Sequence, residues 1–401
     1  MGGDRLILFA NSIFHLTNDG AVTVIAGQIT VLQSLFAFGP FETGLLTGTA
    51  LLVTAVFQVL FGAMSDRRDP SRFLPLGILI LGVGTLFVAS ATSFLLLVVI
   101  VAVSRIGASF YHPVGIAWIG REFQGEALDR SMGFQSSFGD TGVILGMATS
   151  ALIAVSWGWQ SPFLLWGGIN LAAVALGVWL VRGRHYPPKD AADRREYRSL
   201  LRDVRPWLFP LSLVGAGFSI VTAFGPPLLK YKFGLGDASA SVSIALWILA
   251  GAIVAFFFGR VSKRFGRFRT LAASYALFST ACFVGAAAGE LAIVLAAFWT
   301  LGSALFVTYP ALFAFASETS QERLRGTAFG VILGFQLLGG SLGSYAAGSL
   351  AASLRTTLDL EWTAPFYLLG ALVLAGFVYL FAIRRKVANT RSPATATSPP
   401  R

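Results

Sequence analysis

The sequence predicts an all-α membrane protein, with twelve transmembrane helices arranged as two pseudo-symmetric halves of six. Three observations predict this fold class: the composition, the length of the apolar runs and a repeat between the halves. Of the 401 residues, 55% are hydrophobic and only 12% are charged, whereas soluble domains carry about 25% charged residues. The mean hydropathy of +0.72 is typical of a chain that crosses a membrane many times.

The apolar runs are long enough to cross a hydrocarbon core of ~30 Å as helices. The first six cover residues 6–35, 43–64, 73–92, 94–119, 130–155 and 160–181. The second six cover residues 207–229, 238–258, 270–288, 291–315, 325–351 and 363–383. Transmembrane β-strands would be about ten residues long with alternating polarity, so helices fit these runs and strands do not.

One long hydrophilic stretch separates the two sets of six. We therefore expect an N-terminal half (1–181), a cytoplasmic linker (182–206), a C-terminal half (207–385) and a disordered cytoplasmic tail (386–401) rich in Thr, Ser and Pro. Within the linker, residues 194–204 fit either an amphipathic helix at the lipid surface or a solvated connection.

A repeat relates the two halves at an offset of 197 residues. The matching pairs are Gly62 and Gly259, Pro113 and Pro310, Phe138 and Phe335, Gly142 and Gly339, and Gly146 and Gly343. Such parallel repeats are related by an axis along the membrane normal. Transporters built in this way bind substrate near the midplane between the halves, and one half rocks against the other to alternate access.

The basic residues set the expected orientation. The net charge is +11, but the Lys and Arg residues lie in short loops between apolar runs, which excludes nucleic-acid binding as their explanation. Of the 30 basic residues, 26 fall on one side of the predicted spans. The positive-inside rule then predicts a multi-pass protein of the inner (plasma) membrane with both termini in the cytoplasm. The first apolar run is too long for a signal peptide.

Ionisable residues inside the predicted spans are few and lie only in the first half. They are His15, Asp19, Arg105, His112 and Asp140. A charge at this depth is costly and by default indicates function. The second-half spans carry only uncharged polar groups, chiefly Tyr309, Gln336 and Ser or Thr hydroxyls. We therefore expect the first half to handle the coupling ion and the second half to shape the substrate cavity.

His15, Asn18 and Asp19 share one helical face, because their spacing is i, i+3 and i+4. We predict that Asp19 carries the proton and that Arg105 either sets the pKa of Asp19 or holds an anionic group of the substrate. Asp140 is the predicted salt-bridge partner of Arg105. In the alternative interpretation, Arg105 and Asp140 form a static buried pair that only fixes helix register.

Two sets of residues carry these predictions. The proton-coupling set is Asp19, Arg105, Asp140 and His15. The substrate-binding set is Asn18, Arg105, His112, Gln135, Tyr309 and Gln336. For His15, Gln135 and Gln336, hydrogen bonding between helices is an alternative role.

The loop after the second span reads Gly62-Ala-Met-Ser-Asp66-Arg67-Arg68. Asp66 between basic residues predicts a pairing with a neighbouring helix end that latches one access state, and Gly62 would allow close packing. The second-half counterpart contains Gly259 and Arg264. The alternative is that these charges only set the topology.

The loop resembles the cytoplasmic Gly-x-x-x-Asp-Arg motif of the major facilitator superfamily. Here Asp69 and Pro70 stand where the family usually has glycine after the arginine, and Lys263 occupies the acidic position of the second loop. Arg105 falls where the family often has an arginine in its fourth span. The resemblance implies the family fold and secondary transport.

Within that superfamily, the chain most resembles the fosmidomycin-resistance efflux group. The motifs are Phe14-His15-Leu-Thr-Asn18-Asp19-Gly20, Phe110-Tyr-His112-Pro113, Gly133-Phe-Gln135 and Gly139-Asp140-Thr-Gly142. The Gly-Pro pair that drug/proton antiporters share in span five is replaced by Gly146-Met147. The resemblance implies proton-coupled export of a small molecule.

Three functions compete at this point. The first is efflux of a small drug-like or anionic compound by proton antiport. The second is uptake of a sugar, organic acid or phosphorylated metabolite by proton symport, which would use the same residues. The third, a membrane enzyme or sensor, is disfavoured because the sequence has no metal-ligand cluster, nucleophile elbow or phosphate loop. We expect no cofactor and no metal, with a small molecule, protons and lipid as partners, and a monomer.

Overall fold

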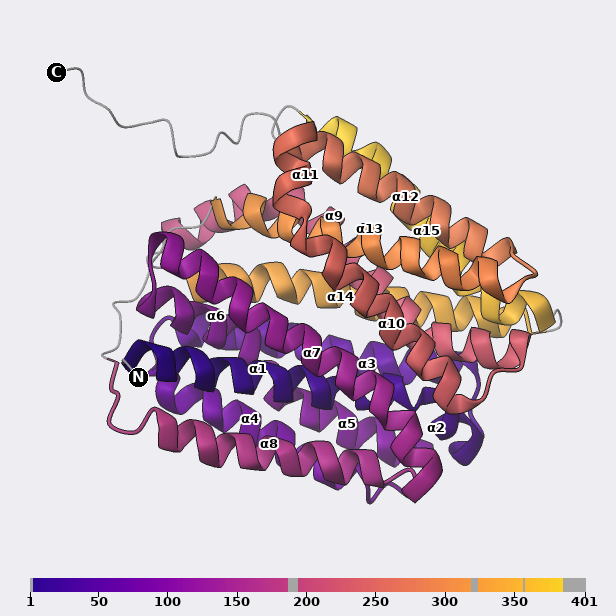
Figure 1. Ribbon diagram of the computed structural model, residues 1–401, viewed down its shortest axis with the longest axis horizontal. Coiled ribbons are helices and arrows are strands. Elements are labelled where there is room, and N and C mark those ends of the chain that lie inside the picture. Colours follow the sequence, from indigo (N-terminus) through magenta and orange to yellow (C-terminus); the bar gives the residue numbers. More distant parts are fainter. Residues whose placement is uncertain (1–2, 187–193, 319–323, 356–357, 385–401) are drawn as a thin grey trace.

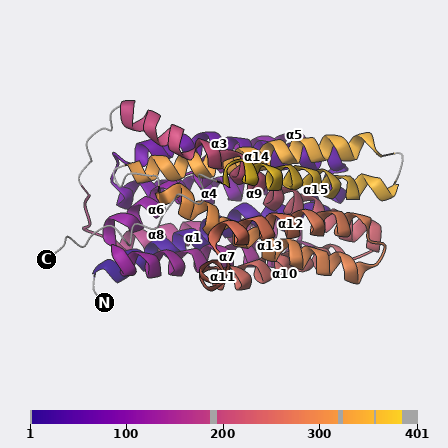
Figure 2. The same ribbon diagram turned by 90° about the horizontal axis from the view of Figure 1, so that it is seen from above.

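The computed structural model describes residues 3–186, 194–318, 324–355 and 358–384. Every regular element in these ranges is a helix, and the helices form one bundle whose axes run in a common direction (Figures 1 and 2). The predicted tail, residues 386–401, lies outside the described residues. The chain is thus an all-α multi-pass membrane protein, as its composition predicts.

Each predicted span corresponds to one helix or to a broken pair of helices, and the short helix α11 is additional. The first half contains α1 (Gly3–Gly27), α2 (Ile29–Phe36), α3 (Pro40–Ser65), α4 (Pro70–Val88), α5 (Phe94–Ala108), α6 (Tyr111–Glu122), α7 (Gly125–Trp157) and α8 (Ser161–Leu180). The second half contains α9 (Arg194–Phe233), α10 (Asp237–Phe256), α11 (Phe258–Phe265), α12 (Arg267–Ala287), α13 (Leu291–Glu318), α14 (Arg325–Ser353) and α15 (Leu358–Ala382). In the described part, 11 helices can cross a membrane, or 12 spans if the bent pair α1–α2 counts as one.

Two spans of the first half are broken. The pair α1–α2 bends by 48°. The fourth predicted span is divided into α5 and α6, which are separated by Ser109 and Phe110. Pro113 follows this break, and its missing N–H removes the hydrogen bond that would have reached the carbonyl of Ser109. The break lies between Arg105 on α5 and His112 on α6, so the two side chains belong to different helical segments.

The sequence repeat is also a repeat of packing. In the first half α1 packs against α7, and in the second half α9 packs against α14. Gly142 of α7 lies against the carbonyl of Leu16, and its counterpart Gly339 of α14 lies against the carbonyl of Ser212. A Cβ at either glycine would overlap the backbone of the partner helix, so the close approach of the helices requires glycine at both positions.

Hydrogen bonds repeat as well. Thr23 Oγ1 donates to the carbonyl of Val143 at 3.5 Å, and Ser219 Oγ donates to the carbonyl of Gly340 at 3.0 Å. Between the halves, α3 packs along α14 and α7 packs along α10 (Figure 1). These two pairs occupy equivalent places in the repeat, which accounts for the pseudo-symmetric bundle.

The boundary of the predicted linker differs from the expectation. Helix α9 begins at Arg194, so residues 194–206 are not a separate connection but the first turns of the helix that becomes the seventh span. Leu200, Val204 and Trp207 of these turns are buried in the core of the second half. This stretch is thus helical and amphipathic, but its apolar face packs against protein and not against the lipid surface that one of the two interpretations predicted.

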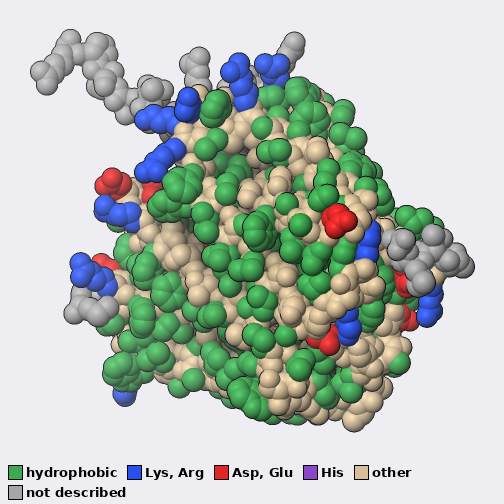
Figure 3. Space-filling model, turned by 45° about the vertical axis from the view of Figure 1, so that its right-hand side comes forward, with side chains coloured by type: hydrophobic (Ala, Val, Ile, Leu, Met, Phe, Trp, Pro, Cys, Tyr) green, Lys and Arg blue, Asp and Glu red, His purple; other side chains and the backbone are tan. Residues whose placement is uncertain are grey.

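Charge is concentrated at one end of the bundle, which we call the basic end. It comprises the start of α1, the α3–α4 loop (66–69), the first turns of α9, helix α11 and the end of α15. Figure 1 shows the start of α1, the first turns of α9, helix α11 and the end of α15 at the same end. In Figure 3, hydrophobic and uncharged residues cover most of the visible face, and charged side chains gather along its upper-left edge and in a smaller group toward the right. This distribution is the one expected of a protein that spans a bilayer.

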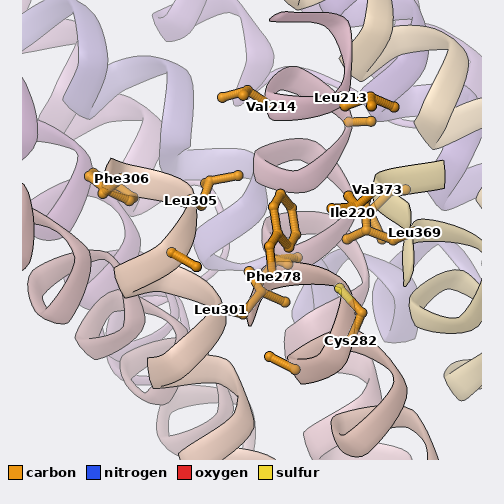
Figure 4. Close-up of a cluster of buried hydrophobic side chains, with 14 of the residues drawn as sticks. Leu213, Val214, Ile220, Phe278, Cys282, Leu301, Leu305, Phe306, Leu369 and Val373 are labelled. Atoms are coloured by element: carbon orange, nitrogen blue, oxygen red, sulfur yellow. The ribbon is translucent and has the colours of Figure 1, made fainter. Parts of the chain in front are cut away.

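The core of the second half is apolar. Helices α9, α12, α13 and α15 contribute a continuous cluster of buried side chains (Figure 4). Its labelled members include Phe278, Cys282 and Leu305. The single cysteine of the chain is thus a buried packing residue.

Candidate functional site

A compact ionisable cluster lies where α1, α6 and α7 meet. The carboxylate of Asp19 is the shared centre: Oδ2 lies 3.2 Å from His15 Nε2 and Oδ1 lies 3.6 Å from His112 Nε2. The ligating atoms of the three residues all lie within 4.8 Å of one another. The cluster is small enough to share one proton or one small cation.

The hydrogen bonding of His15 fixes where its ring proton lies. His15 Nδ1 is 2.8 Å from the backbone carbonyl oxygen of Gln135. A carbonyl only accepts, so Nδ1 carries a proton and donates it. Nε2 of the neutral ring would then direct a lone pair at the Asp19 carboxylate 3.2 Å away. One additional proton between the ring and the carboxylate turns this repulsion into a hydrogen bond.

The three side chains of the cluster differ in how far they are buried. Asn18 Nδ2 donates to Asp19 Oδ1 at 2.8 Å. The side chains of His15 and Asp19 are 9% and 13% exposed, whereas that of His112 is 29% exposed. Of the three cluster residues, His112 therefore has the most exposed side chain.

An aromatic residue positions His15. The Tyr111 ring stacks on the His15 ring with 4.3 Å between centroids. Its hydroxyl lies 2.7 Å from Asn11 Oδ1 and 2.8 Å from Gln135 Oε1, and its single proton serves one of them at a time. Asn11 Nδ2 in turn donates to the carbonyl of Gly115 at 3.0 Å.

Sequence reasoning missed Asn11 and Tyr111. The available signals were weak: Asn11 is four residues before His15 on the same helical face, and Tyr111 adjoins His112. Gln135, predicted to bind substrate, is buried within this network. Its backbone and side chain both hold the groups around His15, in line with the alternative of hydrogen bonding between helices.

Helix α7 forms one wall of the cluster. A Cβ at Gly139 would overlap the imidazole of His15, so a glycine is needed for α7 to approach α1 this closely. Asp140, the next residue, is near enough to interact electrostatically with both His15 and Asp19. Asp140 is therefore a fourth ionisable group of this region.

The prediction that Arg105 pairs with Asp140 is wrong. Arg105 Nη2 donates to the backbone carbonyl of Val22 at 2.6 Å. In the described part of the chain, no carboxylate lies within ion-pair distance of its guanidinium, and its buried Nε has no hydrogen-bond partner. The reason is positional. Arg105 reaches α1 about one turn beyond Asp19, whereas Asp140 approaches α1 from α7 at the level of His15.

The polar residues predicted in the second half are not part of this cluster. Gln336 is buried on α14, the helix that packs against α3 and α9, and its backbone carbonyl lies against Gly215. The side chain of Tyr309 lies outside the described residues. The candidate site therefore draws its ionisable groups from the first half.

The predicted contact of Asp66 with a helix end is confirmed. Asp66 Oδ1 accepts a hydrogen bond from the backbone N–H of Gly326 at 3.0 Å. Its Oδ2 accepts from the N–H of Thr327 at 3.0 Å and from Thr327 Oγ1 at 2.6 Å. Both partners lie in the first turn of α14, where unpaired N–H groups and the helix dipole favour an anion.

Burial affects the Asp66 carboxyl more strongly than these hydrogen bonds do. Removal from water raises the pKa of Asp66 above its ordinary 3.8, although the bonds from Thr327 and Gly326 act in the opposite direction. Close packing supports the contact, because a Cβ at Gly62 would lie 2.7 Å from the carbonyl oxygen of Gly326. Asp66 thus ties α3 of the first half to α14 of the second.

The other predicted gating residues differ from Asp66. Arg67 and Arg264 are exposed. Gly259 lies near the start of α11, and its surroundings are outside the described residues. In the second-half loop Lys263 stands at the acidic position, and its ammonium group cannot accept hydrogen bonds from helix N–H groups as Asp66 does.

Asp69, which occupies the position of the expected glycine, has a structural role. It caps α4 by accepting a hydrogen bond from the N–H of Ser71 at 3.0 Å. Its Oδ2 lies 3.1 Å from His185 Nδ1 and accepts from the N–H of Tyr186 at 3.3 Å. The carboxylate therefore fastens the segment after α8 to the loop that carries Asp66.

Comparison with known proteins gives consistent matches. Residues 8–344 and 211–400 match the family model of the Major Facilitator Superfamily. The chain is 24% identical over 389 residues to the fosmidomycin resistance protein of Escherichia coli (strain K12), covering 92% of each chain. It is 23% identical over 173 residues to the riboflavin transporter RibZ of Clostridioides difficile (strain 630), covering 43% of this chain and 38% of that protein.

Solved structures share the fold. A bacterial homologue of the human lysosomal transporter Spinster, in an inward-facing and unoccupied conformation, superimposes with a TM-score of 0.79 at 16% identity, covering 98% of this chain and 99% of that one. A point mutant of the nucleoside transporter NupG gives a TM-score of 0.74 at 14% identity, covering 96% of this chain and 99% of that one. At these identities the likeness establishes the fold alone.

Proposed function

The chain belongs to the Major Facilitator Superfamily, whose members are transporters and not enzymes, and we propose that it exports a small drug-like or anionic compound in exchange for protons. In this proposal the basic end faces the cytoplasm and the protein acts as a monomer in the inner (plasma) membrane. Similarity to the fosmidomycin resistance protein supports export. Access alternates as the halves rock against each other.

The observation that carries the proposal is the cluster of His15, Asp19 and His112. Its geometry fits an additional proton held between His15 and Asp19, and the cluster lies at the junction of α1, α6 and α7. Loss of that proton leaves the Asp19 carboxylate facing the lone pair of His15. A conformation that admits water between Asp19 and His15 would relieve this repulsion, so proton release and conformational change are linked in this proposal.

The guanidinium of Arg105 supports an anionic substrate. A buried charge without a counter-ion is costly, and in the described part of the chain this guanidinium donates to the neutral carbonyl of Val22 and pairs with no carboxylate. A phosphate, phosphonate or carboxylate of the substrate would supply the missing charge. In this arrangement Arg105 holds the substrate about one helical turn from the proton site.

Two contacts between the halves would serve as gates. At the basic end, Asp66 holds the first turn of α14. At the other end, Lys230 Nζ of α9 donates to Asp237 Oδ1 at 2.7 Å and to Ser34 Oγ of α2 at 3.2 Å. Because Asp66 and Lys230 each join elements of different halves, we propose that each contact must open in turn during transport.

Uptake by proton symport is the second candidate. The same cluster and the same arginine would serve a symporter, which differs only in whether protons and substrate move in the same direction. The sign of the proton flux therefore separates the two functions.

The test uses proteoliposomes with an imposed pH gradient and an internal pH-sensitive dye. Candidate phosphonates, organic acids and drug-like cations are added outside, and substrate-dependent proton movement is recorded. Antiport predicts that protons move opposite to the substrate, and symport predicts that they move with it. Transport of a compound without any proton movement would contradict proton coupling in either direction.

A further inference from the structure

A surface groove lies on the second half at the basic end, away from the cluster. It has a volume of about 390 Å³ and runs between α12 and α15. Ala272, Ala273 and Ala276 form its α12 side, while Phe377 and Phe381 form its α15 side. Phe381 is 48% exposed, and α12 packs on α13 and α15 of its own half. The groove therefore opens outward, toward the hydrocarbon of the membrane.

Two arginines stand at the basic end of this groove. Arg269 belongs to the first turn of α12, and Arg384 follows the last turn of α15. The Arg384 guanidinium lies 5.5 Å from the centroid of the Phe268 ring, which meets the Phe381 ring edge-on at 5.4 Å. Within the described ranges, neither arginine forms an ion pair with a carboxylate.

The chain segments that flank the groove carry no acidic residue near it in sequence. No Asp or Glu occurs from residue 238 to residue 289, and none occurs from residue 362 to the end of the sequence. Residues 260–269 alone contain five Lys or Arg residues. We therefore expect the negative charge that balances Arg269 and Arg384 to come from outside the protein.

Helix α11 places further basic groups beside apolar ones at the same end. Val261 and Phe265 are 39% and 53% exposed, and the Arg264 guanidinium lies 5.3 Å from the centroid of the Phe265 ring. A short helix with exposed apolar and basic side chains is typical of the interface between water and acyl chains. Helix α11 directly precedes α12 (Figure 1), so these basic groups lie at the same end of the bundle as the arginines of the groove.

We propose that the groove between α12 and α15 binds an anionic phospholipid. One acyl chain lies on the alanines between the two phenylalanines, and the phosphate bridges Arg269 and Arg384. A free inorganic anion would leave the apolar groove unused. A second copy of the chain fits poorly, because a symmetric contact would bring the same basic residues of both copies together without any acidic partner.

The test measures binding of dioleoylphosphatidylglycerol to the purified full-length protein in detergent. The readout is the rise in Tm as the lipid concentration increases. Dioleoylphosphatidylcholine and inorganic phosphate are the comparison ligands. The test variant is Arg269→Gln with Arg384→Gln. The matched control is Arg67→Gln with Arg68→Gln, which removes the same charge from exposed positions at the basic end of the first half. Ala273→Trp fills the groove without changing its charge.

We expect phosphatidylglycerol to raise the Tm of the wild type and of the Arg67/Arg68 control. The Arg269/Arg384 variant should bind phosphatidylglycerol at least about tenfold more weakly than the wild type does. The Ala273→Trp variant should also bind this lipid more weakly. An equal response to phosphatidylcholine, or to phosphate alone, would overturn the proposal. Equal weakening in both double variants would also overturn it, because binding would then follow net charge. The experiment needs no transport, so its outcome is independent of the proposed function.

Discussion

The two halves share a backbone arrangement but differ in what they bury. The matched hydrogen bonds of Thr23 and Ser219 align α1 with α9. In this alignment His15 corresponds to Leu211 and Asp19 corresponds to Gly215. The first half thus places an imidazole and a carboxylate where the second has an apolar side chain and no side chain at all.

The same packing geometry therefore supports two kinds of interior. Around Gly215, α14 packs directly against α9, and the neighbouring core is formed by side chains such as Phe278 and Leu305 (Figure 4). Around Asp19, Gly139 instead leaves room for the His15 ring. A duplicated unit can thus keep its helix contacts while only one copy retains titratable groups. The predictions below test this division.

The largest effect is expected from Asp19→Asn. The variant keeps a similar shape but cannot hold the proton shared with His15, so substrate-dependent proton flux in proteoliposomes should fall by about 100-fold or more. Asp203→Asn, at a partly exposed position of α9, is the control and should retain normal flux. Unchanged flux in Asp19→Asn would remove this residue from the mechanism.

The next effect is expected from Arg105→Gln. Because no carboxylate in the described ranges pairs with the guanidinium, the substitution leaves no buried acid unpaired, and the protein should still fold. The apparent affinity for an anionic compound should fall by about tenfold, the loss of one charged hydrogen bond. Binding is measured by isothermal titration calorimetry, with Arg355→Gln as the exposed control. Unfolding of Arg105→Gln would instead favour a purely structural role.

A smaller effect is expected at the contact between the halves. Asp66→Ala leaves the N–H groups of Gly326 and Thr327 without an acceptor, so the closed contact should weaken by about tenfold. The probe is the alkylation rate of a cysteine placed at the buried Ser65, in a Cys282→Ser background. The Glu126→Gln control removes an exposed acid at the basic end and should not change the rate. Equal rates in all three proteins would exclude a latch at Asp66.

A still smaller effect should follow from Gln336→Ala in the second half. We expect a change of roughly threefold in KM, about the worth of one ordinary hydrogen bond, with substrate-dependent proton flux retained. Loss of proton coupling in this variant would break the comparison, because both halves would then carry the ion.

The pH dependence of the Asp66 contact should be modest. Burial raises the pKa of Asp66 above 3.8 in the closed contact, and the pKa returns toward its ordinary value when the contact opens. Protonation therefore favours the closed contact, and this contribution is lost as pH rises through the raised pKa. The Ser65→Cys alkylation rate, divided by the same rate in Asp66→Asn, should increase from about pH 4 upward. A constant ratio would contradict the assignment.

Much of the fold could be predicted from the sequence, because span length and charge are properties of single segments. The apolar runs located the helices, and the offset between the halves located the repeat. The linker boundary was displaced because the charged residues of 194–206 lie on the exposed side of a helix whose other face, with Leu200 and Val204, is buried. The high charge of residues 194–206 indicated a hydrophilic connection and did not show that one face of this helical stretch is buried.

The site was predicted in part. The spacing of His15 and Asp19 was sufficient to place them together, because both lie on one helix. The pairing of Arg105 with Asp140 failed because it depended on the levels at which α5 and α7 meet α1, and the sequence of a single helix does not specify these levels. Tyr111 was missed because its contact with His15 depends on how α6 packs against α1.

The most direct test of a proton-carrying cluster in the first half measures protons released when substrate binds to the purified protein in weakly buffered detergent solution. Wild type, Asp19→Asn and Gln336→Ala are compared at saturating substrate. We predict proton release from wild type and Gln336→Ala, and none from Asp19→Asn. Equal release from Asp19→Asn and wild type would contradict the claim that the first-half cluster carries the proton.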